Sequence, residues 1–555
     1  MVRTALRRAT WAMCLVLLVL HAGRPAEAAV TGLKVGIYSG TGAGASTILA
    51  LFRAVAAMGH SPMALTKADI DGGRLTTANF DVVILPPGED GKTCCAGHYG
   101  AVDGLDQFVT KAAIRAYLTG GGGIVAEEAG AYFAAQNGGT LDIYAGNYAV
   151  VTDQIGRRSF TIVDSAFGAG TQEAWHSFGG GYFPAPPAGV TVAAVDAAGR
   201  PVIVSERSGA GRIILTSFTL ELRGDSTADW TIWDNWAMGD QHSNSAGAWS
   251  MLGRMIGWAF ALDSAAPTIA RTLKPSGVAV AVVADHTVDG GAWPGLLPAV
   301  ARGIEYAGHV PLAIRFQDIK DGRLTLATFR VVTFPGGFAY GYKTGLAGYE
   351  YAVRSFIASG GSYYGICAGS FYAASSVVWE QVTYLYPLQI YAGQDIGPIN
   401  DIAAWPGYAL TPLDVAGDLV GNFGRVATMY YGGGYHTVPS DSAQGSPVYT
   451  AGRFGAGSAF GQAGLVRYAY GNGRVALTTT HLEARAGSAA DDWLFWDDYD
   501  YATGQPVANP DNPWDVMQAV FDQWLVPATT VTPRDVAPPT RPTRRSPGRT
   551  IRRGR

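Results

Sequence analysis

The sequence contains an internal repeat that limits the folds open to it. Residues 68–88 and 317–337 align without a gap and share 12 identities in 21 positions, at an offset of 249 residues. Gly179–Tyr182 and Gly432–Tyr435 form a second matching pair later in the chain. A repeat on this scale indicates one structural unit used twice. The 555 residues are therefore predicted to hold two copies of one domain, each of ordinary domain size.

Each copy alternates short β-branched runs with amphipathic, helix-like runs. Such alternation is typical of a mostly parallel sheet covered by helices on both faces, so the predicted fold class is α/β, as two tandem three-layer domains. In the first copy the expected strands are 35–38 and 82–85, and the helices are near 47–58, 105–118 and 248–261. In the second copy the expected strands are 278–284 and 331–334, and the helices are 296–307, 349–358 and 514–525.

The first residues resemble an export signal. Three arginines precede the apolar run Trp11–Leu20, which is too short to span a bilayer, and Ala26-Glu27-Ala28 offers a small-residue cleavage site near Ala28/Ala29. We expect secretion, to the periplasm or the medium, and no integral membrane segment in the mature chain. The expected organisation is a signal at 1–28, domains at 29–263 and 276–527, a linker at 264–275 and a disordered tail at 528–555.

Charge argues against a nucleic-acid partner. The net charge is -4, and the segment 534–555 alone carries eight arginines and one acid, so the rest of the chain is acidic. A nucleic-acid surface needs clustered basic residues on the folded body. The Pro- and Arg-rich tail is interpreted first as a solvated extension, with weak contact to an anionic surface as the alternative.

A nucleophile elbow is predicted in the second copy. The strand-like run Ser362–Ile366 leads into Cys367, and a helical pattern starts at Ala368, with Gly365 and Gly369 flanking the cysteine as G-x-C-x-G. A sharp strand-to-helix turn needs small residues two positions on either side of the nucleophile. It also places the sulfur at a helix N-terminus, where the dipole favours thiolate. A buried cysteine beside packing glycines is the competing interpretation.

A thiol nucleophile needs a base and an acceptor that orients the base. A strand expected over Arg474–Thr480 ends in His481-Leu482-Glu483. Residues i and i+2 of an extended segment point to the same side, so His481 and Glu483 are predicted to pair beside Cys367.

These motifs resemble the class I glutamine amidotransferases, whose triad is a Cys in G-x-C-x-G and a later His-x-Glu. More narrowly, Gly365–Ala373 and Gly397-Pro398-Ile399 are similar to the biotin-protein ligase N-terminal domain family. The run Pro335–Gly341 resembles an amidotransferase loop that supplies oxyanion amides, which implies that role for Gly337 and Ala368. Glutamine-using relatives often carry Gln where this chain has Phe371, so the resemblance does not imply glutamine as the substrate. It covers residues 276–527 and, more weakly, 32–265.

The first copy is predicted to lack this chemistry. Alignment places Glu128 at the position of Cys367 and Thr219 at that of His481, while Glu221 matches Glu483. Two carboxylates without an imidazole cannot run thiol chemistry. The first domain is therefore expected to be a degenerate copy.

Other features suggest little further chemistry. The pair Cys94-Cys95 could form a vicinal disulfide or remain two thiols. Glu127 and Glu128 with His98 have no metal-ligand spacing, and Gly40–Gly44 departs from the dinucleotide pattern, so neither a metal nor a cofactor is expected.

The leading hypothesis is a secreted thiol hydrolase acting on a small-molecule or peptide amide, or a related acyl substrate. The alternative is a non-catalytic module that binds a small molecule, glycan or peptide.

Overall fold

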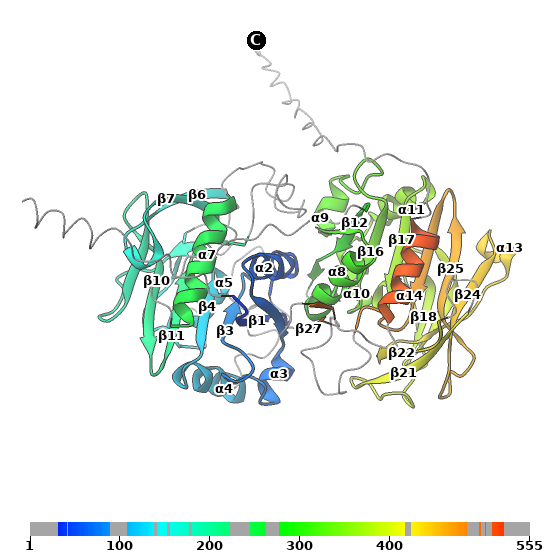
Figure 1. Cartoon of the computed structure of the whole chain (residues 1–555). Helices are drawn as coiled ribbons and strands as arrows, with labels where there is room; N and C mark the ends of the chain where they lie inside the picture. The colour runs from blue at the N-terminus through cyan, green and yellow to red at the C-terminus, as the bar shows by residue number, and fades with distance from the viewer. Residues whose placement is uncertain are drawn as a thin grey trace, which may run out of the picture.

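The structure is a computed structural model. It describes residues 31–40, 43–88, 108–137, 141–151, 156–176, 180–221, 245–261, 277–287, 289–416, 423–484, 499–500, 505–506 and 513–526. Two large mixed sheets, one in each half of the chain, organise these residues (Figure 1).

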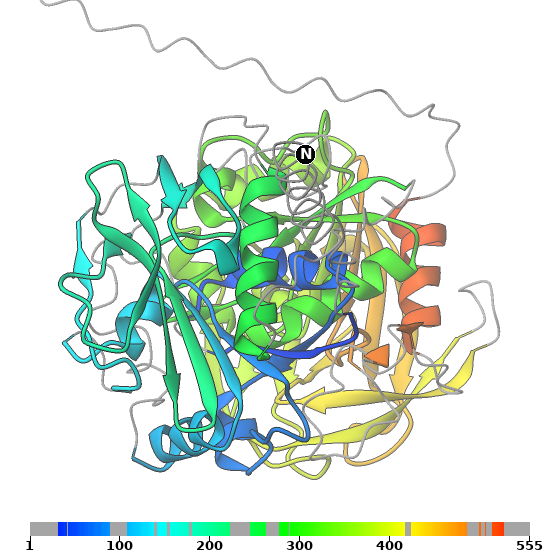
Figure 2. The same ribbon diagram turned by 60° about the vertical axis from the view of Figure 1, so that its left-hand side comes forward.

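The sheet of the first half runs in the order β2-β1-β3-β4-β11-β10-β9-β6-β7. Its first five strands are parallel: β2 (Ser61–Leu65), β1 (Lys34–Tyr38), β3 (Val82–Leu85), β4 (Gly123–Glu127) and β11 (Gly211–Thr216). The rest form an antiparallel arm: β10 (Pro201–Ser208), β9 (Thr191–Asp196), β6 (Gly156–Ile162) and β7 (Gly170–His176). This arm is the cyan-to-green edge in Figure 2.

The second half repeats the parallel part of this sheet. Its strands are β15 (Val310–Ile314), β12 (Ala279–Val283), β16 (Val331–Phe334), β17 (Ser362–Ile366) and β26 (Gly473–Thr478), in that spatial order. The arm beyond them contains β25 (Ala463–Tyr470), β23 (Tyr435–His436), β20 (Tyr391–Gly397), β18 (Ala374–Trp379) and β19 (Val382–Leu385). A hairpin, β21 (Tyr408–Val415) with β22 (Gly424–Tyr431), joins through β24 (Val448–Phe454).

Both parallel sheets follow the order 2-1-3-4-5 of doubly wound α/β folds. The fold class predicted from the alternation of elements is confirmed. The extent of these largely antiparallel arms, in which only β18 and β20 among the described pairs run parallel, was not foreseen. Their strands carry fewer continuous β-branched runs than the buried parallel strands.

Helices cover both faces of each sheet. The first half has α2 (Ala45–Ala57), α3 (Lys67–Asp71), α4 (Phe108–Thr119), α5 (Ala129–Ala134) and α7 (Ser245–Ala259). The second half has α8 (Leu297–Tyr306), α9 (Phe316–Lys320), α10 (Ala339–Gly345), α11 (Glu350–Ala358), α12 (Ala368–Ala373), α13 (Asp441–Gln444) and α14 (Pro513–Val520). A π-helical turn at Phe521–Leu525 follows α14.

Residues on the central strand β17 show this two-sided burial. Tyr364 packs edge-on against Phe521 of the C-terminal π-helical turn, whereas the hydroxyl of its neighbour Tyr363 donates to the Gly369 carbonyl of α12 at 2.6 Å. Both tyrosines are fully buried. Strand neighbours point to opposite faces, so each face is closed by a different layer.

The two halves meet through equivalent helices. Helix α2 of the first half packs against α8 of the second, and Leu49 and Ala50 of α2 belong to the hydrophobic core of the second half (Figure 1). Among the described residues, no helix is long and apolar enough to cross a membrane.

Candidate active site

The chain turns sharply at Cys367. Strand β17 ends at Ile366 and α12 begins at Ala368, with Cys367 between them at φ 48° and ψ -105°. A side chain other than glycine is strained at this φ, by about 1–3 kcal/mol. The backbone N–H of Cys367 donates to the carbonyl of Thr478 at 2.8 Å and so ties the elbow to β26. The backbone at Cys367 therefore forms the elbow that G-x-C-x-G predicted.

The two flanking glycines are required by close approach. A Cβ at Gly369 would lie 2.0 Å from the carbonyl oxygen of Phe334. A Cβ at Gly365 would lie 2.8 Å from the Tyr363 ring and 2.9 Å from the Gly369 carbonyl oxygen. All three distances are shorter than van der Waals contact, so the motif reflects the packing of α12 onto β16 and β17.

His481 and Glu483 lie beyond the carboxyl end of β26. The strand ends at Thr478, two residues earlier than expected, and Glu483 lies in a turn rather than in extended chain. The backbone N–H of His481 donates to the Met429 carbonyl at 2.9 Å, which fixes this segment against β22. The pairing is present although the extended geometry offered for it was wrong: His481 Nδ1 lies 2.8 Å from Glu483 Oε1.

This pair is completely buried, with no exposed surface on either side chain. Burial opposes the charged ring, but the Glu483 carboxylate and then the Cys367 sulfur outweigh it and raise the pKa of His481 to about 10. Nε2 of His481 has no hydrogen-bond partner among the described residues, so we attribute the influence of Cys367 chiefly to its charge. The ring carries a proton at neutral pH.

Cys367 is 5 % exposed, and its Sγ lies 3.7 Å from the carbonyl oxygen of Tyr431. The Tyr431 ring lies between Trp293 at 5.5 Å and Trp405 at 5.3 Å, and the exposed Phe338 packs edge-on against Trp405. This aromatic group beside the thiol was missed from the sequence. Trp293, Phe338 and Trp405 come from separate loops and Tyr431 from the end of β22, and no periodicity links them.

The predicted oxyanion donors lie on either side of the elbow. Gly337 follows β16 at φ 145°, where an added Cβ would lie 2.0 Å from the Gly291 carbonyl oxygen. Its neighbour Gly336 touches the His481 ring, because a Cβ there would lie 2.5 Å from Cε1. In the described part of the chain, neither the Gly337 nor the Ala368 backbone N–H donates a hydrogen bond. Both amides are thus unpaired near the imidazole and the thiol.

Phe371 occupies the position where glutamine-using relatives often carry Gln, and its side chain is buried in an apolar contact. It is 7 % exposed, and its ring packs edge-on against Trp379 at 6.0 Å.

The first half keeps the elbow without the thiol. Glu128 has φ 42° and ψ -103°, and its N–H donates to the Thr216 carbonyl at 2.9 Å, as Cys367 does to Thr478. Thr219 donates its backbone N–H to the Trp175 carbonyl at 2.9 Å, as His481 does to Met429. Trp249 Nε1 donates to the Glu221 carbonyl at 2.9 Å, and Trp514 does the same to Glu483. The alignment of Glu128, Thr219 and Glu221 with the triad positions is therefore reproduced in the backbone.

Two buried carboxyls face each other in that half. Glu127 and Glu221 are fully buried. Burial first, and then the charge of the neighbouring carboxyls, raises the pKa of both groups well above the ordinary value. Within the described residues, no group of three or more His, Cys, Asp or Glu side chains could hold a metal ion. Glu127 was considered from the sequence only as a metal ligand, and its pairing with Glu221 was not foreseen.

Several predictions fall outside the described residues. These are the signal-like segment with Ala28 and Ala29, the pair Cys94-Cys95 with His98, the linker and the basic tail.

The geometry defines a class of site: a thiol elbow at the carboxyl edge of a doubly wound sheet, with an imidazole–carboxylate pair just beyond the end of the neighbouring strand β26. Residues 326–493 match the family described as "Biotin-protein ligase, N terminal", and that part of the chain is a domain of this family. The matched region contains Gly337, Cys367, Ala368, His481 and Glu483. The resemblance stated from the motifs is confirmed for residues 326–493.

No curated protein matches the chain. Among solved structures, a putative GMP synthase component from Thermoplasma acidophilum is 14% identical, with 41% of this chain and 94% of that chain covered and a TM-score of 0.29. A cytoplasmic protein from Salmonella typhimurium is 11% identical, with coverage of 42% and 100% and a TM-score of 0.26. A beta-galactosidase from Bacillus circulans sp. alkalophilus is 12% identical, with coverage of 47% and 34% and a TM-score of 0.22.

Proposed function

We propose that the second half is a thiol hydrolase acting on an amide or a related acyl group of a small molecule or peptide. The observation that carries the proposal is the fully buried His481–Glu483 pair beside Cys367, with the pKa of His481 raised to about 10. An imidazolium next to a thiol stabilises the thiolate, which is the nucleophilic form.

The proposed reaction has two steps. The thiolate of Cys367 adds to the carbonyl carbon, and the backbone N–H groups of Gly337 and Ala368 hold the oxyanion that forms. His481 gives its proton to the leaving amine, the C–N bond breaks, and a thioester remains on Cys367. Water then attacks the thioester while His481 accepts its proton, and the acid and the thiolate are released. Glu483 holds the ring and stabilises its charged form.

The aromatic group at Trp293, Trp405, Tyr431 and Phe338 supports a substrate with an apolar or ring-bearing body. Aromatic faces give a large contact area at low entropic cost. Glutamine has no large apolar or ring-bearing body. In addition, Phe371 stands where glutamine-using relatives often carry Gln. We therefore propose a larger amide, and we propose that the chain acts outside the cytoplasm because of its signal-like first residues.

Activity-based labelling of Cys367 with an electrophile, competed by a panel of amides, tests this proposal. The panel contains glutamine and cell-wall peptides, and Cys367→Ser is the unreactive control. We expect one amide class to slow labelling of the wild-type protein and to be cleaved by it. If no electrophile labels Cys367, the hydrolase proposal fails.

A binding module is the second candidate, favoured by one observation. The first half preserves the elbow backbone with Glu128 in place of the thiol, so the fold persists without the chemistry. On this account, a ligand that raises the melting temperature would do so equally in Cys367→Ser.

A further inference from the structure

A row of four residues crosses the antiparallel arm of the second half. Asp395 of β20 lies opposite His436 of β23, His436 lies opposite Ala463 of β25, and Ala463 lies opposite Arg453 of β24. Side chains of directly opposite residues project from the same face of a sheet. The row therefore presents a carboxylate, an imidazole, a methyl group and a guanidinium in that order.

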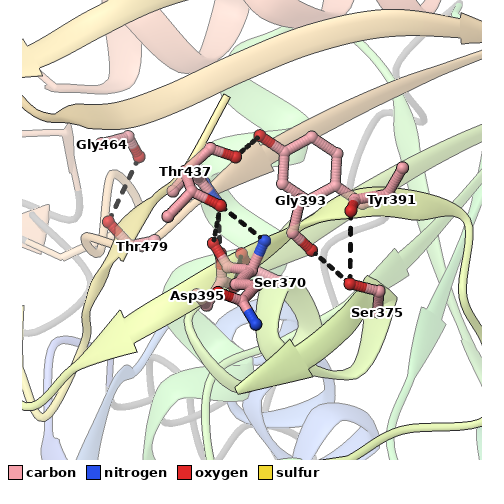
Figure 3. Close-up of polar contacts among 11 residues, drawn as sticks. Ser370, Ser375, Tyr391, Gly393, Asp395, Thr437, Gly464 and Thr479 are labelled. Carbon is pink, nitrogen blue, oxygen red and sulfur yellow. Dashed lines mark hydrogen bonds and ion pairs between the residues drawn. The ribbon is translucent and has the colours of Figure 1, made fainter. Parts of the chain in front are cut away.

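The carboxylate end of the row is closed. Asp395 is fully buried, with Oδ1 2.5 Å from His436 Nδ1 and Oδ2 accepting from Ser370 Oγ at 3.0 Å. Figure 3 shows Ser370 and Asp395 grouped with Thr437 and Tyr391. The Tyr391 ring also packs edge-on against the imidazole, at 5.6 Å. His436 is therefore held in one orientation with Nδ1 committed to Asp395.

The other nitrogen of His436 has no protein partner. His436 is 1 % exposed, and its Nε2 makes no hydrogen bond to any residue that the structure describes. A buried polar atom left unsatisfied costs about 1–3 kcal/mol. Such a group in a native fold points to a missing partner.

A cavity lies over this part of the row. It has a volume of about 660 Å³, and its walls come from β23, β24, β25 and their flanking loops. The small Ala463 separates His436 from Arg453 and leaves room between them. The lining consists of His436, Thr437, Val438, Val448, Tyr449, Thr450, Arg453, Gln462 and Ala463.

The cavity is positively charged. None of its lining residues is acidic. Arg453 Nη1 donates to the Gly461 carbonyl at 2.8 Å, and in the described portion of the chain no carboxylate lies within ion-pair distance of it. The nearest acid in register, Asp414, is instead bound by both Nε and Nη2 of Arg425, at 2.7 and 3.0 Å.

We propose that this cavity binds a small solute bearing a carboxylate or phosphate group. The guanidinium of Arg453 pairs with the oxyanion, as its planar donors favour. Because Nδ1 of His436 donates to Asp395, its Nε2 accepts a hydrogen bond from a hydroxyl group of the solute, such as the P–OH of hydrogen phosphate or the hydroxyl of citrate. Thr450 and Gln462 supply a hydroxyl and an amide at the wall for the remaining polar atoms. This site is separate from the thiol and does not depend on hydrolase activity.

Isothermal titration of the full chain tests the site. The probes are inorganic phosphate and citrate, and glycerol is the uncharged control. We expect saturable binding of at least one anion and none of glycerol, and the stronger probe shows which oxyanion the site prefers. Arg453→Gln is expected to weaken binding about tenfold or more, because a hydrogen bond to a charged group is lost. Arg453 is exposed, so this variant is expected to fold.

Matched variants sharpen the test. Arg330→Gln removes the same charge from an exposed residue beside β16, which lies several strands away from the cavity. Cys367→Ser removes the thiol. Both variants are expected to bind the anion as the wild type does. His436→Gln is expected to weaken binding by a similar factor to Arg453→Gln. The proposal is overturned if neither anion binds saturably, or if Arg453→Gln binds the anion as tightly as the wild type.

Discussion

The paired carboxyls of the first half predict an unusual pH dependence of stability. A carboxyl with a raised pKa in the folded state keeps its proton there at pH values where the unfolded chain has lost it. The folded state then binds more protons, so stability falls as pH rises from the unfolded pKa to the folded one. The pKa of Glu127 moves from 4.5 to about 8, and that of Glu221 is also raised, so the window runs from about pH 4.5 to 8.

The magnitude follows from the linkage relation. Each pH unit inside the window changes the free energy of unfolding by about 1.4 kcal/mol for one proton. Ionisation of Glu127 is therefore expected to cost the first half about 2.5 kcal/mol between pH 5 and pH 7, and Glu221 adds to this loss. Buried His60, whose pKa is lowered to about 4, acts in the opposite direction and returns about 2 kcal/mol over the same interval. Glu127→Gln cannot ionise, so it removes the part of the loss that Glu127 contributes and stabilises the first half at pH 8.

Hydrogen exchange measured by mass spectrometry at increasing urea concentration provides the assay, because peptides from β4 and β11 report the first half separately. Asp142→Asn, which removes an exposed carboxylate of the same half, is the matched control and should keep the wild-type slope. The reasoning is refuted if, between pH 5 and pH 7, the wild type loses no more stability at β4 than Glu127→Gln does. It is equally refuted if Glu127→Gln is less stable than the wild type at pH 8.

Three further predictions concern variants of the second half. Gly369→Ala should lower the free energy of unfolding by about 1–3 kcal/mol in urea titrations, since its Cβ would lie 2.0 Å from the Phe334 carbonyl oxygen; unchanged stability would contradict the packing described. Trp514→Phe leaves the buried Glu483 carbonyl without its donor and should cost about 1–3 kcal/mol in the same assay. Glu483→Gln should lower the pKa of His481 from about 10, followed by the ring's NMR shifts against pH, and an unmoved pKa would show that Glu483 is not the source of the shift.

The elbow and the parallel strands were the most predictable parts of the structure. The strand runs at 82–85, 331–334 and 362–366 coincide with β3, β16 and β17, because strands buried on both faces carry continuous apolar runs. Gly365 and Gly369 revealed the elbow because only glycine fits their contacts. Such local requirements are visible in one sequence.

The parts that were missed depend on contacts between distant segments. The pairing of Glu127 with Glu221 needs β4 and β11 to be neighbours, which only the sheet order gives. The row from Asp395 to Arg453 needs four strands in register, and no spacing in the sequence encodes it. His481 and Glu483 were paired correctly, but through a turn after β26 rather than along an extended strand.

The rate at which iodoacetamide alkylates Cys367 at pH 7 tests the central claim most directly, with peptide mapping to separate Cys367 from the other cysteines. His481→Asn removes the charge beside the sulfur, and His60→Asn, at a buried histidine of the first half, is the control. The account predicts that His481→Asn slows alkylation about tenfold or more, while His60→Asn alkylates at the wild-type rate. Equal rates in the wild type and His481→Asn would contradict the thiolate–imidazolium site.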